Sequence, residues 1–273
     1  MSAVAIVGGG SWGTALALAL GRSPRRHELR LWVREPELAA RMRERRENDL
    51  FLPGFSLPES LRITSELAEA ARGADILLSV VPSKYLRAVW KELAALLPKG
   101  CAVLSATKGL ETESLARPSE VVAQAGGRAV DSRLAALSGP SFAREVAAGL
   151  PAALVIASGN EELAQRLQEE LSGPDFRLYT NTDVAGVEIG GAVKNVIAIA
   201  AGVADGLELG TTARAALITR GLAEMTRLAM ACGGRAETLA GLAGLGDLVL
   251  TCTGALSRNR TLGMELARGR RLE

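Results

Sequence analysis

The stretch AVAIVGGGSWGTALALALG, residues 3–21, decides the fold class. A five-residue apolar run leads into GGGSWG, which fits the pattern G-x-G-x-x-G, and an alanine–leucine run follows it. A strand, a glycine-rich turn and a helix in this order are the context in which the pattern indicates a dinucleotide-binding loop. There Gly8 makes the tight turn, Gly10 lets a pyrophosphate approach the backbone, and Gly13 lets the helix pack on the strand. The helix amino terminus then offers N–H groups to the phosphates.

The rest of the chain continues the alternation of strand and helix. Helical patterns cover 35–47 and 84–97, and five further short apolar runs are typical of buried strands: 29–33, 76–81, 102–107, 134–138 and 152–158. This order predicts an α/β fold with a parallel, doubly wound sheet. After Asn181 the strand-like runs stop and alanine–leucine–glycine stretches take over. We therefore expect a Rossmann-type domain over 1–180 and an all-α substrate domain over 181–273.

The composition is that of an ordinary globular protein. The chain is 48% hydrophobic and has a formal net charge of +2, which does not favour nucleic-acid or membrane-surface binding. Three scattered cysteines without metal-site spacing predict a reduced, cytoplasmic setting and no metal. The amino terminus lacks a signal-peptide layout, and no uninterrupted apolar run approaches the roughly 20 residues of a spanning helix.

Histidine, a frequent acid–base catalyst, occurs once, as His27 in the polar segment SPRRHELR. We expect a solvated loop residue there, because a catalytic histidine normally lies in a cleft. An acid–base enzyme with this sequence would therefore use Lys, Asp, Glu or Tyr as its base.

One lysine, Lys194, interrupts the apolar stretch GVEIGGAVKNVIAIAAGVADG at 186–206. We expect this stretch to form a buried helix. Burial favours the neutral amine and lowers the pKa of a lysine, which would suit Lys194 to act as a general base on an alcohol. The alternatives are a lysine whose amine reaches solvent and a core ion pair with Glu188.

Arg34 follows the second strand-like run, at the position that separates the two nicotinamide dinucleotides. An acidic residue there binds the ribose 2′-hydroxyl of NAD, whereas an arginine accommodates the 2′-phosphate of NADP. Because Arg34 precedes Glu35, we expect NADP(H), with use of NAD(H) as well. The alternative is a solvated Arg34 without such a role.

Three other places hold polar side chains that suit an anionic ligand. Lys108 comes just after a buried strand, where ligands of open α/β sheets bind. Asp247 lies between glycines and an apolar run, and Ser257-Arg258-Asn259 would offer a hydroxyl, a guanidinium and an amide to a phosphate. A surface lysine at 108 and a plain helix N-cap at 257 are the simpler interpretations.

Taken together, six ordered segments resemble the bacterial-type NAD(P)-dependent glycerol-3-phosphate dehydrogenases. They are GGGSWGTALA at 8–17, NDLFLPG at 48–54, SATKGLE at 105–111, SGPSFAREV at 138–146, GGAVKNVIAIAAGVADG at 190–206 and GLGDLVLTCTGALSRNRTLG at 244–263. The resemblance runs essentially from end to end. It implies a Rossmann domain, a helical substrate domain, and reversible interconversion of dihydroxyacetone phosphate and sn-glycerol 3-phosphate for phospholipid synthesis. A homodimer is also expected.

The resemblance assigns roles to individual residues. Lys194 would be the proton acceptor. In the mechanism that we expect, the catalytic role of Asp247 is to orient Lys194 or a substrate hydroxyl. The substrate site would comprise Lys108, Gly139, Ser141, Lys194, Asn195, Asp247, Ser257, Arg258 and Asn259. The dinucleotide would contact Ser11, Trp12, Arg34, Lys108, Ala143 and Arg258, in addition to the loop glycines. The roles of Ser141 and Ala143 rest on the resemblance alone.

Two departures and two rival functions remain at this point. Gly254 stands where the resemblance leads us to expect a small hydroxyl residue, and family members continue past residue 273 with helical segments that include a cofactor-contacting glutamate. One rival is a dehydrogenase of a hydroxy acid or another sugar phosphate; a carboxylate substrate would not need the clamp at 257–259. The other is a non-catalytic dinucleotide-binding sensor, which would not need a buried Lys194.

Overall fold

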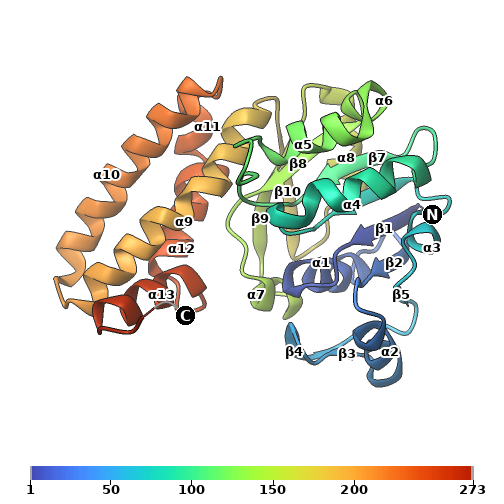
Figure 1. Ribbon diagram of the computed structural model, residues 1–273, viewed down its shortest axis with the longest axis horizontal. Helices are drawn as coiled ribbons and strands as arrows, with labels where there is room; N and C mark the ends of the chain where they lie inside the picture. Colours follow the sequence, from blue (N-terminus) through green and yellow to red (C-terminus); the bar gives the residue numbers. More distant parts are fainter. Residues whose placement is uncertain (1, 272–273) are drawn as a thin grey trace.

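The computed structural model describes residues 2–271, except for the side chains of 128 and 129. It has an eight-stranded sheet in the order β10-β9-β8-β7-β6-β1-β2-β5, and a group of helices at one side of it (Figure 1). The strands are β1 (Ala3–Val7), β2 (Glu28–Trp32), β5 (Arg62–Thr64), β6 (Ile76–Ser79), β7 (Ala102–Ser105), β8 (Leu134–Ser138), β9 (Ala152–Ala157) and β10 (Phe176–Asn181). This is the expected Rossmann-type architecture.

Helices cover both faces of the sheet, which explains why its central strands are continuous apolar runs. One face packs against α1 (Ser11–Gly21) and α8 (Glu161–Leu171). The other packs against α3 (Leu67–Ala71), α4 (Ser83–Leu96) and α5 (Pro118–Gly126). The remaining elements of this part are α2 (Pro36–Arg45), the hairpin of β3 (Glu47–Asn48) and β4 (Leu52–Ser56), α6 (Arg128–Asp131) and α7 (Ala143–Ala147).

The predicted parallel, doubly wound sheet is confirmed except for one antiparallel strand pair near one edge. Strands β5, β2, β1, β6, β7 and β8 are parallel, but β9 pairs with β8 in the antiparallel sense, and β10 follows β9. Residues 139–151 join β8 to β9 and contain only the five-residue helix α7, whereas α1 and α4, which connect the parallel pairs β1–β2 and β6–β7, have 11 and 14 residues. The apolar patterning did not reveal β5, β10 or the β3–β4 hairpin either, because these segments are short or half exposed.

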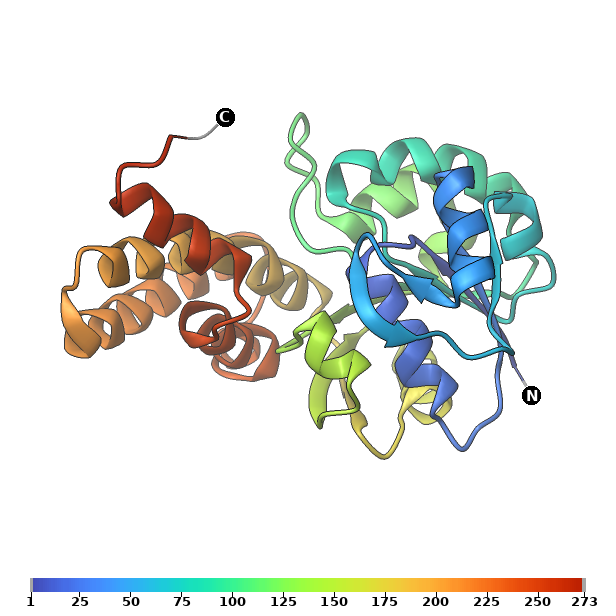
Figure 2. The same ribbon diagram turned by 90° about the horizontal axis from the view of Figure 1, so that it is seen from below.

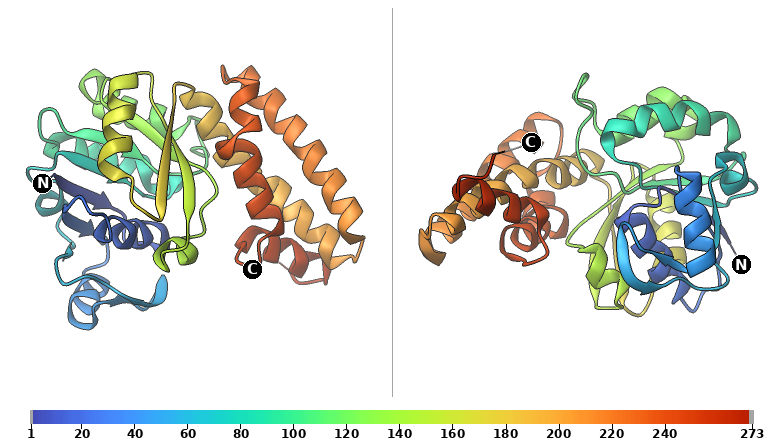
Figure 3. Two further views of the ribbon diagram at one scale, coloured as in Figure 1. Left: turned by 180° about the vertical axis from the view of Figure 1, so that it is seen from behind. Right: turned by 60° about the horizontal axis from the view of Figure 1, so that its bottom comes forward.

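The helices after Asn181 gather on one side of the sheet (Figures 2 and 3). They are α9 (Val184–Gly206), α10 (Gly210–Ala231), α11 (Ala236–Ala240), a π-helix η1 (Leu242–Gly246), α12 (Asp247–Thr253) and α13 (Arg258–Ala267). Helix α9 is central, since α10, α12 and α13 all pack against it. A Cβ added at Gly202 would lie 2.0 Å from the carbonyl oxygen of Arg260, so α9 and α13 are in direct backbone contact.

Helix α9 is long and apolar enough, by length and composition, to cross a membrane, but half of that stretch is buried inside the protein. Lys194, near its middle, is buried as expected. The apolar residues of α9 are therefore explained by packing against the sheet and the neighbouring helices.

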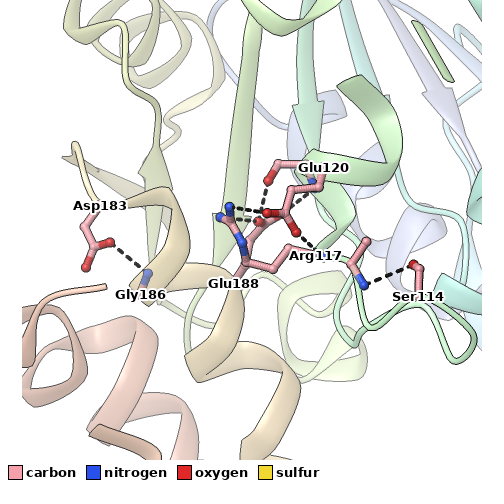
Figure 4. Close-up of polar contacts among 8 residues, drawn as sticks. Ser114, Arg117, Glu120, Asp183, Gly186 and Glu188 are labelled. Atoms are coloured by element: carbon pink, nitrogen blue, oxygen red, sulfur yellow. Dashed lines mark hydrogen bonds and ion pairs between the residues drawn. The ribbon is translucent and has the colours of Figure 1, made fainter. Parts of the chain in front are cut away.

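The amino-terminal half of α9 is tied to the sheet part by buried polar contacts (Figure 4). The Asp183 carboxylate caps the helix by accepting from the Gly186 N–H at 2.8 Å. The buried Glu188 carboxylate accepts from the Ser119 N–H at 2.8 Å, from the Ser119 hydroxyl at 2.6 Å, and from Arg117 at 3.3 Å. An ion pair between Lys194 and Glu188, one of the alternatives above, is therefore not formed.

His27 lies in a loop, as predicted, but it is half-buried and not simply solvated. Its Nε2 lies 3.0 Å from the Glu170 carbonyl oxygen, and burial is the main cause that lowers the pKa of its imidazole. The residue precedes β2, at the amino-terminal edge of the parallel strands, so it is far from their carboxyl ends.

Candidate active site

A cavity of about 820 Å³ lies along the carboxyl ends of β1, β2, β6, β7 and β8, where α9, α12 and α13 face the sheet. Ligands of doubly wound sheets bind at this edge. All of the expected site residues except Gly139 line this cavity: Gly8, Gly10, Ser11, Trp12, Gly13, Arg34, Lys108, Ser141, Ala143, Lys194, Asn195, Asp247, Ser257, Arg258 and Asn259. Residues from both ends of the chain thus share one cleft.

The glycine loop has the geometry that a pyrophosphate site requires. Gly8 has φ +126°, and a Cβ there would lie 2.6 Å from the Val80 carbonyl oxygen. A Cβ at Gly13 would lie 1.9 Å from the Gly8 carbonyl oxygen, so only glycine lets α1 start this close to β1. At Gly10, in contrast, no atom lies within 4 Å of the point that a Cβ would occupy, so the backbone there is open to the cavity.

Two features support the fit of a dinucleotide to this loop. Helix α1 has no side-chain cap and no acidic residue in its first turn, so its N–H groups and positive dipole end are available to an anion. The buried indole N–H of Trp12, which lines the cavity, has no hydrogen-bond partner among the described residues. Both features suit a ligand that brings its own acceptors.

The deepest polar group of the cavity is a carboxylate between two lysines. Asp247 is 1% exposed; its Oδ2 accepts from Lys108 Nζ at 2.7 Å, and its Oδ1 accepts from Lys194 Nζ. Lys108 also donates to the Gly139 carbonyl oxygen at 3.0 Å, which gives Gly139 a role although it does not line the cavity. One carboxylate cannot neutralise two ammonium groups, so the cluster carries a net positive charge when both lysines are protonated.

This arrangement lowers the proton affinity of Lys194. Burial and the nearby charge of Lys108 lower the pKa of Lys194 to about 7, and Asp247 only partly opposes them. The side chain of Lys194 is 8% exposed and that of Lys108 is 22% exposed. Burial therefore disfavours the charged form of the Lys194 amine more strongly. A lysine with a pKa near neutrality can take up and release a proton under physiological conditions.

The local backbone explains how Asp247 reaches this position. The glycine-rich segment LAGLG at 242–246 forms the π-helix η1, and Asp247 begins α12 directly after it. A Cβ at Gly244 would lie 2.1 Å from the Leu239 carbonyl oxygen, so the tight path of this segment needs glycine. Single turns of π-helix are frequent at functional sites.

The other end of the cavity contains the amino terminus of α13. Ser257 is buried and caps the helix by accepting from the Arg260 N–H at 3.2 Å, so the N-cap interpretation of this residue is confirmed. Asn259 donates to the Asn195 side chain at 2.8 Å, which joins α13 to the residue after Lys194. Arg258 is exposed to the cavity and forms no ion pair within residues 2–271. A free guanidinium at a helix amino terminus suits a phosphate.

Arg34 lies at the opposite end of the cavity, after β2. Its guanidinium is 2.9 Å from the Glu35 carboxylate and 4.9 Å from the ring centroid of Tyr85. The side chain is 56% exposed, so a 2′-phosphate can reach it without desolvating a buried charge.

Gly254 differs from the expected hydroxyl residue for a steric reason. A Cβ at this position would lie 2.5 Å from the ring of Phe142, which lines the cavity beside Ala143. The ring of Phe142 takes the space that a side chain at 254 would need.

Comparison with known proteins agrees with this geometry. The chain matches the sequence profile of the NAD-dependent glycerol-3-phosphate dehydrogenase N-terminus over residues 3–164 and that of the C-terminus over 183–273. The chain belongs to the NAD-dependent glycerol-3-phosphate dehydrogenase family. Curated members named glycerol-3-phosphate dehydrogenase (NAD(P)+) include one from Koribacter versatilis, 55% identical over 272 residues, and one from Citrifermentans bemidjiense, 54% identical over 269. These alignments cover 100% and 98% of this chain and 80% of each relative.

The fold of this dehydrogenase family is also recognised among solved structures. The crystal structure of glycerol-3-phosphate dehydrogenase from Coxiella burnetii superposes with a TM-score of 0.91 at 46% identity, covering 98% of this chain and 81% of that one. Within the described residues there is no group of three or more His, Cys, Asp or Glu side chains that could hold a metal ion.

The dehydrogenase cleft also contains residues that the sequence did not single out. Phe51 and Pro53 from the β3–β4 hairpin, Tyr85 from α4 and Thr251 from α12 all line it. Phe51 and Pro53 belong to NDLFLPG, one of the six segments that carry the family resemblance, but the resemblance assigned no binding role to either residue. Tyr85 and Thr251 lie in ordinary helical patterns, and only the tertiary structure brings them to the cavity.

Proposed function

We propose that this chain catalyses reversible hydride transfer between NAD(P)H and dihydroxyacetone phosphate, giving sn-glycerol 3-phosphate for phospholipid synthesis. The observation that carries the proposal is the position of Lys194. It lies buried against Asp247, in one cavity with the glycine loop at one end and the Arg258–Asn259 helix terminus at the other. A phosphorylated ketone and a dinucleotide can therefore meet beside a titratable amine.

The bound dinucleotide would supply the hydride to the ketone carbon. Charge then develops on the carbonyl oxygen, and the protonated Lys194 amine donates its proton there; in the reverse direction the neutral amine accepts the hydroxyl proton. Asp247 holds the amine in place and keeps its protonated form accessible despite burial.

Lys108 has two effects in this proposal. Its ammonium group lowers the pKa of Lys194 across the shared carboxylate, and it adds positive charge where the oxygen of the substrate becomes negative. Its bond to the Gly139 carbonyl oxygen orients it from the β8 side.

The two ends of the cavity would select the ligands. Arg258 and Asn259, with the α13 amino terminus, bind the phosphate of the substrate. Arg34 favours NADP(H) over NAD(H) by pairing with the 2′-phosphate, and its neighbour Glu35 retains some use of NAD(H). Ser11, Trp12, Gly13 and Ala143 complete the dinucleotide side, and Ser141 the substrate side.

The setting of the protein is part of the same proposal. We place it in the cytoplasm as a homodimer, with a dinucleotide domain at 1–180 and a substrate domain at 181–273. The reduced cysteines and the family resemblance support these assignments.

The test is a turnover assay on this chain, followed by loss of NADPH or NADH absorbance. We expect oxidation of both with dihydroxyacetone phosphate, a higher kcat/KM with NADPH, and a reduced NADPH preference in Arg34→Leu. A 2-oxo acid in place of dihydroxyacetone phosphate should give no turnover. Turnover with the 2-oxo acid alone would favour the hydroxy-acid rival, and NADPH binding without any turnover would favour the sensor.

A further inference from the structure

Asn48 connects the two walls of the dinucleotide end of the cleft. It is fully buried, on β3 of the hairpin that lies outside the main sheet (Figure 1). Its Nδ2 donates to the Gly9 carbonyl oxygen at 2.9 Å and to the Thr14 hydroxyl at 2.8 Å, while its Oδ1 accepts from the Phe51 N–H at 3.1 Å. The amide orientation is unambiguous, because a carbonyl can only accept and a backbone N–H can only donate.

The bond to Gly9 sets the direction of one peptide group. In a planar trans peptide the carbonyl of one residue and the N–H of the next point in opposite directions. Because Asn48 holds the Gly9 carbonyl toward the interior, the Gly10 N–H points away from Asn48, at a residue that lines the cavity. Glycine is otherwise free to rotate here, since it has no side chain that restricts the peptide.

The bonds to Thr14 and Phe51 extend this control to the surroundings. Thr14 is buried in the second turn of α1, whose first turn faces the cavity. Phe51 is the first of three consecutive hairpin residues, 51–53, that line the same cavity as the glycine loop. One amide therefore ties the glycine loop and α1 to the hairpin residues of that cavity.

We propose that Asn48 is a positioning residue for dinucleotide binding, which presents the Gly10 N–H to the pyrophosphate and fixes the hairpin wall against the glycine loop. This inference rests on the proposed function, because it assumes that a nicotinamide dinucleotide occupies the loop. Asn48 does not line the cavity, so it acts through Gly9, Thr14 and Phe51 and not by contact with the ligand.

The test separates dinucleotide binding from substrate binding in two variants. Asn48→Leu fills a similar space without a donor, and Asn48→Ala leaves the space empty. For both we expect a rise of about tenfold in the Kd and KM for NADPH, with the KM for dihydroxyacetone phosphate and the kcat at saturating NADPH changed by less than about threefold. Binding is measured by NADPH fluorescence, and stability by thermal unfolding of the same samples.

A control variant removes a neighbouring hairpin bond and keeps all three bonds of Asn48. Glu47→Ala removes the 2.7 Å bond that the Gly54 N–H donates to the Glu47 carboxylate. It should lower the melting temperature but leave the Kd for NADPH within about twofold.

The outcomes separate the inference from the function on which it rests. If wild-type protein does not bind NADPH, the proposed function fails and this inference with it. If wild-type protein binds NADPH and a folded Asn48 variant binds it equally well, or if both KM values rise together, only the positioning role of Asn48 is overturned. A selective rise in the NADPH constants, absent from Glu47→Ala, supports it.

Discussion

At the scale of single residues, the chemistry depends on one carboxylate shared by two amines. Asp247 is almost fully buried, so each lysine gains a strong partner, but the pair of ammonium groups has only one negative charge between them. Burial and the charge of Lys108 lower the pKa of the more deeply buried amine, Lys194, to about 7. In the proposed mechanism the proton-transfer group is therefore produced by burial and by a neighbouring like charge, and no histidine is needed.

Lys194→Ala should reduce turnover by about 10²-fold or more, because it removes the group that exchanges the proton with the substrate oxygen. The measurement is kcat with dihydroxyacetone phosphate and NADPH, on protein whose melting temperature shows that it is folded. Lys91→Ala, an exposed lysine on α4, serves as the control and should retain wild-type turnover. Near-normal turnover of a folded Lys194→Ala protein would refute the assignment.

The pH dependence follows from the pKa of Lys194 at about 7. In the oxidation of sn-glycerol 3-phosphate the amine must be neutral, so kcat/KM should rise with pH through about 7; in the reduction direction it must be protonated, so kcat/KM should fall above that pH. In Lys108→Met the lowering effect of the second ammonium is lost. The inflection should then move to higher pH by on the order of one unit. An unchanged inflection in Lys108→Met would show that the two lysines are not coupled.

At the scale of elements, α9 is the support on which the substrate side of the site is built. It begins beside the amino-terminal edge of β8, passes along the sheet, and brings Lys194 and Asn195 to the carboxyl edge. Helix α13 packs on its second half, where glycine at 202, 206 and 263 permits close contact of the two backbones. The amino terminus of α13 is thereby held at a set position relative to Lys194.

Gly202→Ala should disturb this support, because the added Cβ would lie 2.0 Å from the Arg260 carbonyl oxygen and backbone would have to move. We expect a loss of stability of about 1–3 kcal/mol and a higher KM for dihydroxyacetone phosphate, with the Kd for NADPH nearly unchanged. Urea unfolding and steady-state kinetics measure the two effects. Val196→Ala, on the exposed side of the same helix, should change neither. A Gly202→Ala protein with wild-type KM and stability would contradict this account.

At the scale of the whole molecule, the contacts between the sheet part and the helical part include the apolar packing of β9 against α9 and η1 and the buried contact of Glu188 with Ser119 and Arg117 (Figure 4). Burial raises the pKa of Glu188 to about 7, and its bonds with Ser119 and Arg117 oppose the shift. The unfolded chain releases this proton near 4.5, whereas the folded protein retains it up to about 7. The contribution of Glu188 to stability is thus full at acidic pH and is lost as the pH rises toward 7.

Glu188→Gln should remove this dependence, since an amide stays neutral at every pH. Relative to wild type, the variant should gain stability between pH 5 and pH 8, by up to about 3 kcal/mol. Thermal unfolding across that pH range measures the difference. Glu59→Gln, which changes a carboxylate that is 89% exposed, should show no such gain with rising pH. A constant difference between Glu188→Gln and wild type would disprove the pH linkage.

Part of the fold and part of the site could be predicted from local patterns. The glycine loop between β1 and α1, the apolar strands and the burial of Lys194 follow from turn chemistry and periodicity, which operate over a few residues. The directions of β9 and β10 could not be predicted in this way, because an apolar run has the same pattern in either direction. The role of Asn48 was hidden for a related reason: its partners Gly9 and Thr14 are more than thirty residues away.

The sequence by itself determined that a dinucleotide-type loop opens the chain, that a lysine lies within an apolar helix, and that polar clusters occur at 108, 247 and 257–259. Only the tertiary structure decided that Lys108 and Asp247, 139 residues apart, touch, and that Lys194 joins them in one cavity. Local sequence governs which conformation a segment prefers. Which distant side chains meet, and what pKa they acquire, is decided by how the segments pack and exclude water.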